Sequence, residues 1–347
     1  PSAATISEPA PIANADASRS ASIEVAALPD LSYAHALSAI PVVRAVRVDY
    51  RGPELRGASV EIEAICGLGP LGDPKVVIAD LDGRTPSVLR GVDLTLDPSR
   101  MLSVENPMKG LIRVTLRDTA GVVVARHESP VSVLAGNQWR AVPLQLGLEL
   151  LAAFVQPNAL AIAPLLVEAS DRLRQATGSP ALDGYQQGSR ERVDSIVEAI
   201  YESIRARDVR YAEPPASWGL DGGQKVRTPA EVLEGRLGTC LDTTVTLAAA
   251  LEEAGINSTL WMLEGHIFLG YWRDEASLDG PAQMDASEAV NYVGLGQIEL
   301  VETTFLTGGA SSKPFADARR HHESRGIRQK AQRAGSTDAG YQIRYRR

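Results

Sequence analysis

The sequence predicts an α+β protein in which an antiparallel β-sandwich is followed by a second, α+β domain. Between residues 31 and 142, apolar side chains alternate with polar ones, and Gly, Pro and Asp separate the runs, which is typical of an antiparallel sandwich. Between residues 143 and 310, the apolar spacing becomes helical and short apolar runs follow it, which predicts helices and strands together. The 347 residues, 44% of them apolar, are enough to form a core in each domain.

The first domain carries its alternating pattern in several short segments. Val46, Val48 and Tyr50 form one such set. Others are Val60 and Ile62; Ile112, Val114 and Leu116; and the apolar runs 76–78 and 122–124. Because no chemistry-bearing residues cluster there, we expect a spacer or docking module, with Cys66 as a buried small apolar side chain.

The second domain begins with two amphipathic helices, expected at about residues 159–176 and 190–207, which serve as packing elements. Pro214-Pro215 and Gly222-Gly223 then mark an exposed loop that contains Trp218. We assign Trp218 to the wall of a substrate cleft; the alternative is that it merely anchors the loop.

Cys240 opens the next helix. Thr239 has the hydroxyl of an N-cap, the helix presents an apolar side, and Gly255 ends it. Helix N-terminal amides and a nearby imidazolium stabilise a thiolate, the nucleophilic form of cysteine. The alternative is a structural thiol. Asp242 is expected to brace the loop or to pair with Arg236 rather than to act on substrate.

His266 and Glu302 follow in the order that a thiol nucleophile needs. Short apolar runs at 259–263 and 265–272 predict two neighbouring strands, with His266 near the turn between them or at the start of the second. A third strand, 297–301, ends at Glu302, whose carboxylate would orient the imidazole. Trp261, on the strand before His266, is assigned to substrate binding together with Trp218.

The order of cysteine, helix, strand, histidine, strand and acid resembles the transglutaminase-like branch of the papain-like thiol enzymes. Glu302-Thr303-Thr304 stands where that family usually has Asp-Pro-Thr. Gln224 lies where a papain-like enzyme keeps a side-chain amide for the oxyanion. The resemblance therefore implies Cys240 as nucleophile, His266 as proton carrier and Glu302 as the orienting acid, with no cofactor and no metal.

Several segments together look like the N-terminal region of very large bacterial helicase-like proteins, some of them linked to phage defence. They are 31–36, 154–158, 182–186, 210–211, 214–217 and 227–242. In such proteins a β-domain and a transglutaminase-like domain precede a helicase motor and a nuclease. The chain itself has no phosphate-binding G-x-x-x-x-G-K-[ST] loop. We therefore expect a piece of a larger protein or a stand-alone relative, whose partner is a helicase or nuclease module in the same or another chain.

The two ends of the chain differ from the domains in composition. Residues 1–30 are rich in Ala, Ser and Pro and are expected to form a disordered leader. Residues 311–347 form a basic connector or tail with ten Lys or Arg residues, including a solvated helix at about 315–334. The alternative is a nucleic-acid contact, which lacks an aromatic stacking platform. His321 and His322 have no cysteines near them and are not expected to bind metal.

Charge and cysteine content narrow the classes of protein. A net charge of −8 and a pI near 5.3 argue against general attraction to nucleic acid. Two cysteines do not make a disulfide framework and favour a reducing, cytoplasmic location, and no apolar run is long enough to span a bilayer. Two function classes stay open: a thiol-dependent acyl-transfer enzyme acting on a protein or peptide, and an inactive peptide-binding or scaffold module.

Overall fold

The computed structural model shows two compact units, with the boundary between Gly136 and Asn137. The structure describes residues 19–140, 144–213, 223–263, 265–280, 282–283, 287–324 and 341–344. Helices and strands both contribute, as the predicted α+β class requires. Within the described residues, no helix is both long enough and apolar enough to cross a membrane.

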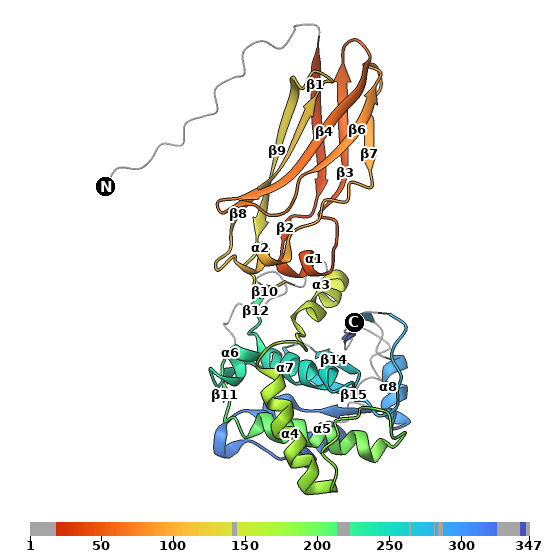
Figure 1. Ribbon diagram of the computed structural model, residues 1–347. Helices are drawn as coiled ribbons and strands as arrows, with labels where there is room; N and C mark the ends of the chain where they lie inside the picture. The colour runs from red at the N-terminus through yellow and green to blue at the C-terminus, as the bar shows by residue number, and fades with distance from the viewer. Residues whose placement is uncertain are drawn as a thin grey trace, which may run out of the picture. The chain divides into compact units, whose positions relative to one another are not determined.

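The first unit consists of two β-sheets and two short helices (Figure 1). One sheet has the order β1-β3-β7 and is antiparallel: β1 (Ser20–Ala27), β3 (Val43–Arg51) and β7 (Ser87–Arg90). The other has the order β2-β9-β8-β4-β5, with β6 also paired to β4: β2 (Asp30–Leu31), β4 (Leu55–Cys66), β5 (Gly69–Pro70), β6 (Lys75–Leu81), β8 (Met108–Arg117) and β9 (Val123–Val133). Helices α1 (Tyr33–Leu37) and α2 (Pro98–Leu102) complete the unit.

The core of the first unit lies between the inner faces of these sheets, since β1 also contacts β9 of the other sheet. Alternate residues of β3, β4 and β8 are at most 1% exposed: Val46, Val48, Tyr50, Val60, Ile62, Ile112, Val114 and Leu116. Cys66 differs from the expectation, because it lies at the end of β4 and is only half-buried. Its Sγ accepts the N–H of Leu68 at 3.4 Å in the turn that follows.

The second unit contains most of the helices. They are α3 (Leu144–Leu151), η1 (Ala152–Phe154), α4 (Ile162–Thr177), α5 (Arg190–Arg205), α6 (Pro229–Leu233), α7 (Cys240–Glu253), α8 (Ser287–Gly294), η2 (Thr303–Leu306), η3 (Gly309–Ser311) and α9 (Phe315–Ser324). Its antiparallel sheet has the order β16-β18-β14-β15-β17: β14 (Ser258–Leu263), β15 (His266–Trp272), β16 (Ala282–Gln283), β17 (Ile298–Val301) and β18 (Tyr341–Arg344). Two small ladders pair β10 (Gln138–Trp139) with β12 (Gln224–Lys225) and β11 (Arg210–Tyr211) with β13 (Leu237–Gly238).

Helix α7 is the central element of the second unit (Figure 1). It contacts β14 and β15 of the sheet, helices α4, α5 and α6, and η2. The sequence suggested a helix with one apolar side, yet every residue from Cys240 to Glu252 is buried. The reason is that neighbours cover all sides, and small or hydroxyl-bearing residues such as Thr244 and Ala248 allow them to approach closely.

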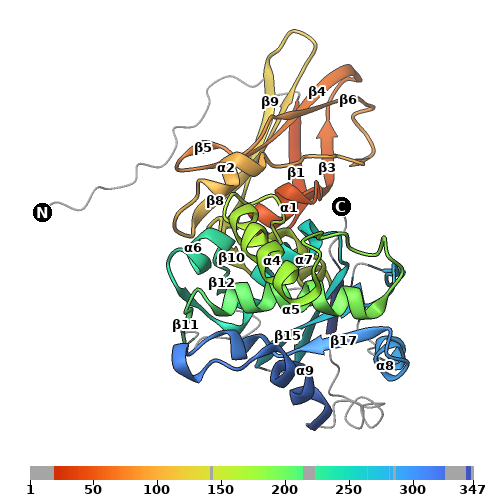
Figure 2. The ribbon, with the colours of Figure 1, turned by 60° about the horizontal axis from the view of Figure 1, so that its bottom comes forward.

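Helix α9 does not form the solvated connector that the basic composition of the tail suggested. It packs on β17 (Figure 2), and its residues Phe315 and Ala318 are 2% and 0% exposed. Arg319 donates to Glu299 of β17 at 2.7 Å. The described first part of the tail therefore belongs to the second unit. Residues 325–340 and 345–347, which carry most of the remaining basic side chains, lie outside the described residues.

Candidate active site

The first turn of α7 is fixed by a capping box. The hydroxyl of Thr239 accepts the backbone N–H of Asp242 at 3.2 Å, and Oδ2 of Asp242 accepts the N–H of Thr239 at 2.9 Å. Cys240 is the first residue of the helix and is 1% exposed. The N-cap predicted from the sequence is therefore present, and it places the thiol at the positive end of the helix.

Asp242 braces the neighbouring loop through Arg227, not through Arg236. Its Oδ1 accepts the Arg227 backbone N–H at 2.7 Å, and its Oδ2 accepts the Arg227 guanidinium at 2.7 Å. Arg236 instead is exposed, with a backbone φ of 50° in the turn before β13. Because Asp242 is fully buried, both of its oxygens are used for structure. It also ties the chain just after Gln224 to the first turn of α7.

His266 and Glu302 come together from adjacent strands of the sheet. His266 is the first residue of β15, opposite Leu263 of β14, and Glu302 directly follows β17, which pairs with β15. The His266 Nε2 atom lies 2.9 Å from Oε2 of Glu302. The other carboxylate oxygen, Oε1, accepts the backbone N–H of Thr304 at 3.0 Å and its hydroxyl at 2.7 Å.

The electrostatics of this pair favour an imidazolium and a carboxylate. Burial lowers the pKa of His266, but the neighbouring Cys240 and the hydrogen bond and charge of Glu302 outweigh this effect and raise that pKa to about 9. Burial raises the pKa of Glu302, but the bonds from His266 and Thr304 hold it down at about 2. Both groups are therefore charged at neutral pH.

A further pair of hydroxyl groups links the cysteine's helix to the acid's loop. Thr244 lies one turn after Cys240 in α7, and its hydroxyl donates to the Cys240 carbonyl at 2.7 Å. The hydroxyl oxygen of Thr244 also lies 2.7 Å from the hydroxyl oxygen of Thr303, the residue that immediately follows Glu302. This buried contact fixes the distance between the element that carries the thiol and the element that carries the acid.

Tyr211 is a neighbour of the thiol that sequence reasoning missed. Strand β11 runs parallel to β13, with Tyr211 opposite Gly238, and the N–H of Ala212 donates to the Gly238 carbonyl at 2.9 Å. Tyr211 is 39% exposed, and the partial burial of its phenol and the nearby Cys240 raise its pKa to about 12. A strand of two residues leaves no periodic pattern, so only the position of Arg210-Tyr211 among the resembling segments marked it.

Gln224, assigned to the oxyanion, is 6% exposed in β12. Within the described part of the chain, neither its Oε1 nor its Nε2 has a hydrogen-bond partner. A buried amide without partners is costly, which is typical of a group kept for a ligand. Trp218 lies outside the described residues.

Trp261 does not lie where a substrate could reach it, so its assignment to substrate binding is wrong for this structure. Its side chain is 1% exposed, and its ring is stacked on Phe268 with centroids 6.0 Å apart. The indole N–H donates to the hydroxyl of Thr259 at 3.0 Å. The strand pattern could not distinguish the two faces of β14, because both are covered.

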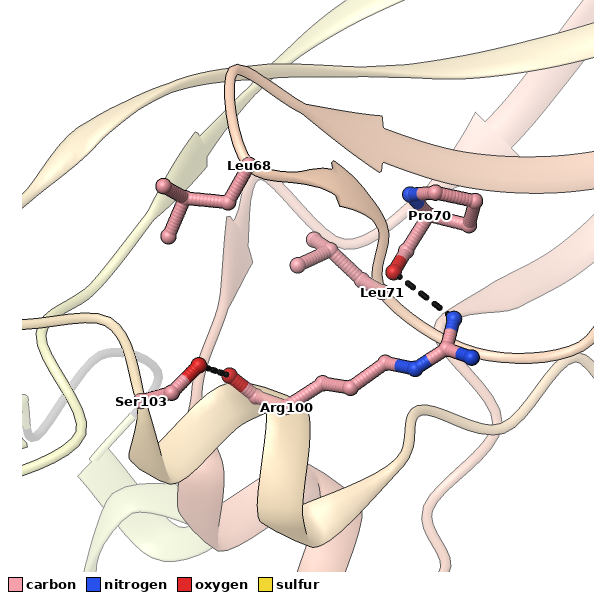
Figure 3. Close-up of a pocket in the computed structure, with 5 residues that line it drawn as sticks. All are labelled: Leu68, Pro70, Leu71, Arg100 and Ser103. Atoms are coloured by element: carbon pink, nitrogen blue, oxygen red, sulfur yellow. Dashed lines mark hydrogen bonds between the residues drawn. The ribbon is translucent and has the colours of Figure 1, made fainter.

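Other parts of the described chain offer less chemistry. No group of three or more His, Cys, Asp or Glu side chains is arranged to hold a metal ion among the described residues. A pocket of about 250 Å³ in the first unit (Figure 3) is lined by Leu68, Pro70, Leu71, Arg100 and Ser103. Arg100 is the one ionisable group in that lining, and it donates to the Pro70 carbonyl at 3.0 Å. The pocket therefore has no nucleophile with an adjacent base.

Comparison with known proteins does not assign the chain to a family. No protein-family model and no curated protein sequence matches the chain. Among solved structures, the chain is similar to a family 76 glycoside hydrolase from a bovine Bacteroides thetaiotaomicron strain, at 11% sequence identity. That match covers 73% of this chain and 55% of the length of that one, with a TM-score of 0.16. A likeness at this TM-score carries no argument about fold or function.

Proposed function

We propose that the second unit is a transglutaminase-like domain that performs thiol-dependent acyl transfer on a protein or peptide. The observation that carries the proposal is the pair of His266 and Glu302, whose Nε2 and Oε2 atoms lie 2.9 Å apart, with Cys240 at the start of α7 near enough to affect the pKa of His266. A nucleophile bonded to a base that a third group orients is the general arrangement of covalent acyl-transfer sites.

In the first half of the reaction, the thiolate of Cys240 attacks the carbonyl carbon of an amide or carboxamide. A carbon–sulfur bond forms, and the carbonyl electrons move onto oxygen. The imidazolium of His266 then gives its proton to the departing nitrogen, the carbon–nitrogen bond breaks, and a thioester with Cys240 remains. Glu302 holds the ring in place and balances its positive charge.

In the second half, an oxygen or nitrogen nucleophile resolves the thioester. His266, now neutral, takes a proton from water or from an amine as that molecule attacks the thioester carbon. The carbon–sulfur bond breaks, and the proton stays on His266, so the ion pair is restored. Water gives a peptidase or deamidase, whereas an amine gives a transglutaminase.

Gln224 is proposed to stabilise the negative oxygen that forms in both halves. Its amide nitrogen is a neutral donor in a buried position, which is what an oxyanion site requires. Arg227 follows Gln224 by three residues, and its contact with Asp242 holds this part of the chain beside the first turn of α7. The amides of that turn would act as further donors.

The wider setting of the domain follows from the resemblance. We propose that the first unit is the β-sandwich that precedes a transglutaminase-like domain in bacterial helicase-like proteins, in the cytoplasm. A helicase or nuclease module would then be the partner, and the basic tail would connect to it. The proposed association with phage defence rests on the same resemblance to bacterial helicase-like proteins.

A second function is favoured by one observation: Cys240 is 1% exposed. A thiol covered in this way suits a domain that binds a peptide or serves as a scaffold without turnover. The two functions differ in whether a small acyl donor reaches the sulfur.

An acylation experiment tests the proposal. The full chain, with Cys66→Ser to remove the half-buried second thiol, is incubated with p-nitrophenyl acetate, and the acetyl group is located by peptide mass mapping. We expect a thioester at Cys240 that forms at least tenfold more slowly in His266→Ala, since the base is lost. Absence of acylation at Cys240 in a folded chain would contradict the acyl-transfer function and favour the peptide-binding or scaffold function.

A further inference from the structure

A second histidine, His321, lies against the acid of the candidate site. Its Nε2 atom is 3.9 Å from Oε2 of Glu302, the same oxygen that faces His266. This distance is too long for a direct hydrogen bond, but it is within reach of an electrostatic contact or one bridging water. One carboxylate oxygen thus faces two imidazoles that come from different elements, β15 and α9.

The position of His321 is fixed by the packing of α9. The backbone N–H of Glu302 donates to the carbonyl of Ala318 at 3.2 Å, so the helix is joined to the residue that carries the acid. Phe315 is 2% exposed, and Arg319 donates to Glu299 at 2.7 Å. His321 follows Ala318 by three residues and so lies on the same face of the helix.

The ring of His321 is also held from its other side. It meets the ring of Phe305 edge-on, with centroids 4.8 Å apart, and its side chain is 20% exposed. The ammonium of Lys313 lies 4.2 Å from the centre of the Phe305 ring. The imidazole therefore fills the space between an aromatic ring and the carboxylate, where it limits both rotation of Glu302 and access of water to it.

We propose that His321 is a positioning residue for the acyl-transfer site: its imidazole keeps Oε2 of Glu302 directed at His266. The inference rests on the proposed function of the second unit and extends it to α9, in a segment that composition alone marked as a solvated tail. In this arrangement the contact of Glu302 with Thr304 fixes Oε1, and His321 lies against Oε2 together with His266.

The readout is the pKa of His266. Burial lowers this pKa, but the hydrogen bond and charge of Glu302 help to raise it to about 9, so a carboxylate that turns away from the ring lowers it. Tyr201 and Tyr211 also interact with the charge of Glu302, and the pKa of each phenol is raised, that of Tyr211 to about 12. The phenols therefore do not ionise in the range in which His266 titrates.

The experiment is an NMR titration of the full chain with ¹³C-labelled histidine, in which the His266 signal is assigned by its loss in His266→Ala. Two variants keep the size of residue 321: His321→Gln retains a hydrogen-bond donor, and His321→Leu retains only packing. Arg320→Ala is the matched control, because that neighbouring side chain is 68% exposed and pairs only locally with Asp317 among its described contacts.

We expect the pKa of His266 to fall by about 0.5 unit or more in His321→Leu, a threefold loss of proton affinity, while His321→Gln and Arg320→Ala titrate as the wild type. An unchanged pKa in His321→Leu, or an equal fall in His321→Gln, would overturn the inference. If instead the wild-type His266 titrated near its ordinary value of 6.5, the ion pair behind the proposed function would be absent. The two failures are therefore distinguishable.

Discussion

His266 and Glu302 are joined by a hydrogen bond of 2.9 Å between Nε2 and Oε2, although 36 residues separate them in the chain. The acid is held from its other oxygen by Thr304 and is only 2% exposed. A carboxylate that is fixed on one side and offers its second oxygen to an imidazole sets both the orientation and the charge of that ring.

The first prediction concerns this bond. In Glu302→Gln the side chain keeps its shape but loses its charge, so the pKa of His266 should fall from about 9 towards 6.5. Acylation of Cys240 at pH 7 should slow by about a hundredfold or more, because the ring is no longer oriented and its charge no longer balanced. The histidine NMR titration and the acylation assay measure the two effects. A wild-type profile in Glu302→Gln would assign the third role to another residue.

The matched control for this variant is Glu288→Gln. Its carboxylate accepts the hydroxyl of Tyr292 at 3.2 Å on the exposed face of α8. This change removes the same charge from the same unit, and it should leave the pKa of His266 in place.

Gln224 provides a second prediction, since its amide has no partner in the described part of the chain. Gln224→Ala should reduce acylation by p-nitrophenyl acetate by about a hundredfold, as the loss of an oxyanion donor does. Alkylation by iodoacetamide passes through no oxyanion and should keep its rate. Equal slowing of both reactions would indicate damage to the thiol itself, and no slowing of either would remove Gln224 from the site.

Much of the candidate site could be predicted because its signals are local. Gly255 ends α7 with a φ of 77°, and Thr239 begins it with a hydroxyl that accepts a backbone N–H. The strand that ends at Glu302 likewise follows from a short apolar run with a polar stop. These features depend on residues close together in the sequence, so pattern reasoning reaches them.

The contacts that were missed depend on long-range packing. Asp242 pairs with Arg227 and not with Arg236, because the chain between β12 and α6 brings Arg227 to it although the two residues are 15 positions apart in the sequence. Trp261 is buried because both faces of its strand are covered. The docking of α9 depends on two apolar residues, Phe315 and Ala318, within a basic segment. Average composition hides such a pair.

Asp242 gives a prediction about stability. Asp242→Asn removes the charge that faces Arg227 in a fully buried position, while the capping position stays occupied. The free energy of unfolding should fall by about 2 kcal/mol, because the half-buried guanidinium of Arg227 loses the charge of its partner. Urea denaturation measures this. Asp171→Asn, at an exposed pair with Arg174, should change the free energy by no more than about 0.5 kcal/mol.

His35 makes the stability of the first unit dependent on pH. It is 7% exposed and its Nδ1 lies 2.8 Å from the hydroxyl of Ser32; burial lowers its pKa from 6.5 to about 4, although Asp30 opposes this. Between these two values the unfolded chain binds a proton that the folded chain does not. The contribution of His35 to the free energy of unfolding is therefore complete above about pH 6.5 and decreases as the pH falls towards 4.

This dependence can be isolated with His35→Gln. Between pH 7.5 and pH 5, the wild type should lose about 2 kcal/mol more free energy of unfolding than the variant. Urea denaturation of both chains, followed by circular dichroism, gives the difference directly, and carboxylates that titrate in the same range cancel. Equal losses in the two chains would show that His35 keeps an ordinary pKa in the fold.

The central claim is that His266 activates Cys240, and the most direct measurement is the rate of iodoacetamide labelling at Cys240 as a function of pH. The chain carries Cys66→Ser, and the variants are His266→Ala and Tyr211→Phe, the latter to remove the hydroxyl of a residue near the thiol. We expect rapid labelling at pH 6, where an ordinary thiol is almost entirely protonated. In His266→Ala the pH 6 rate should fall by about tenfold or more, and in Tyr211→Phe it should not fall. Slow labelling at pH 6 that does not respond to His266→Ala would contradict the account.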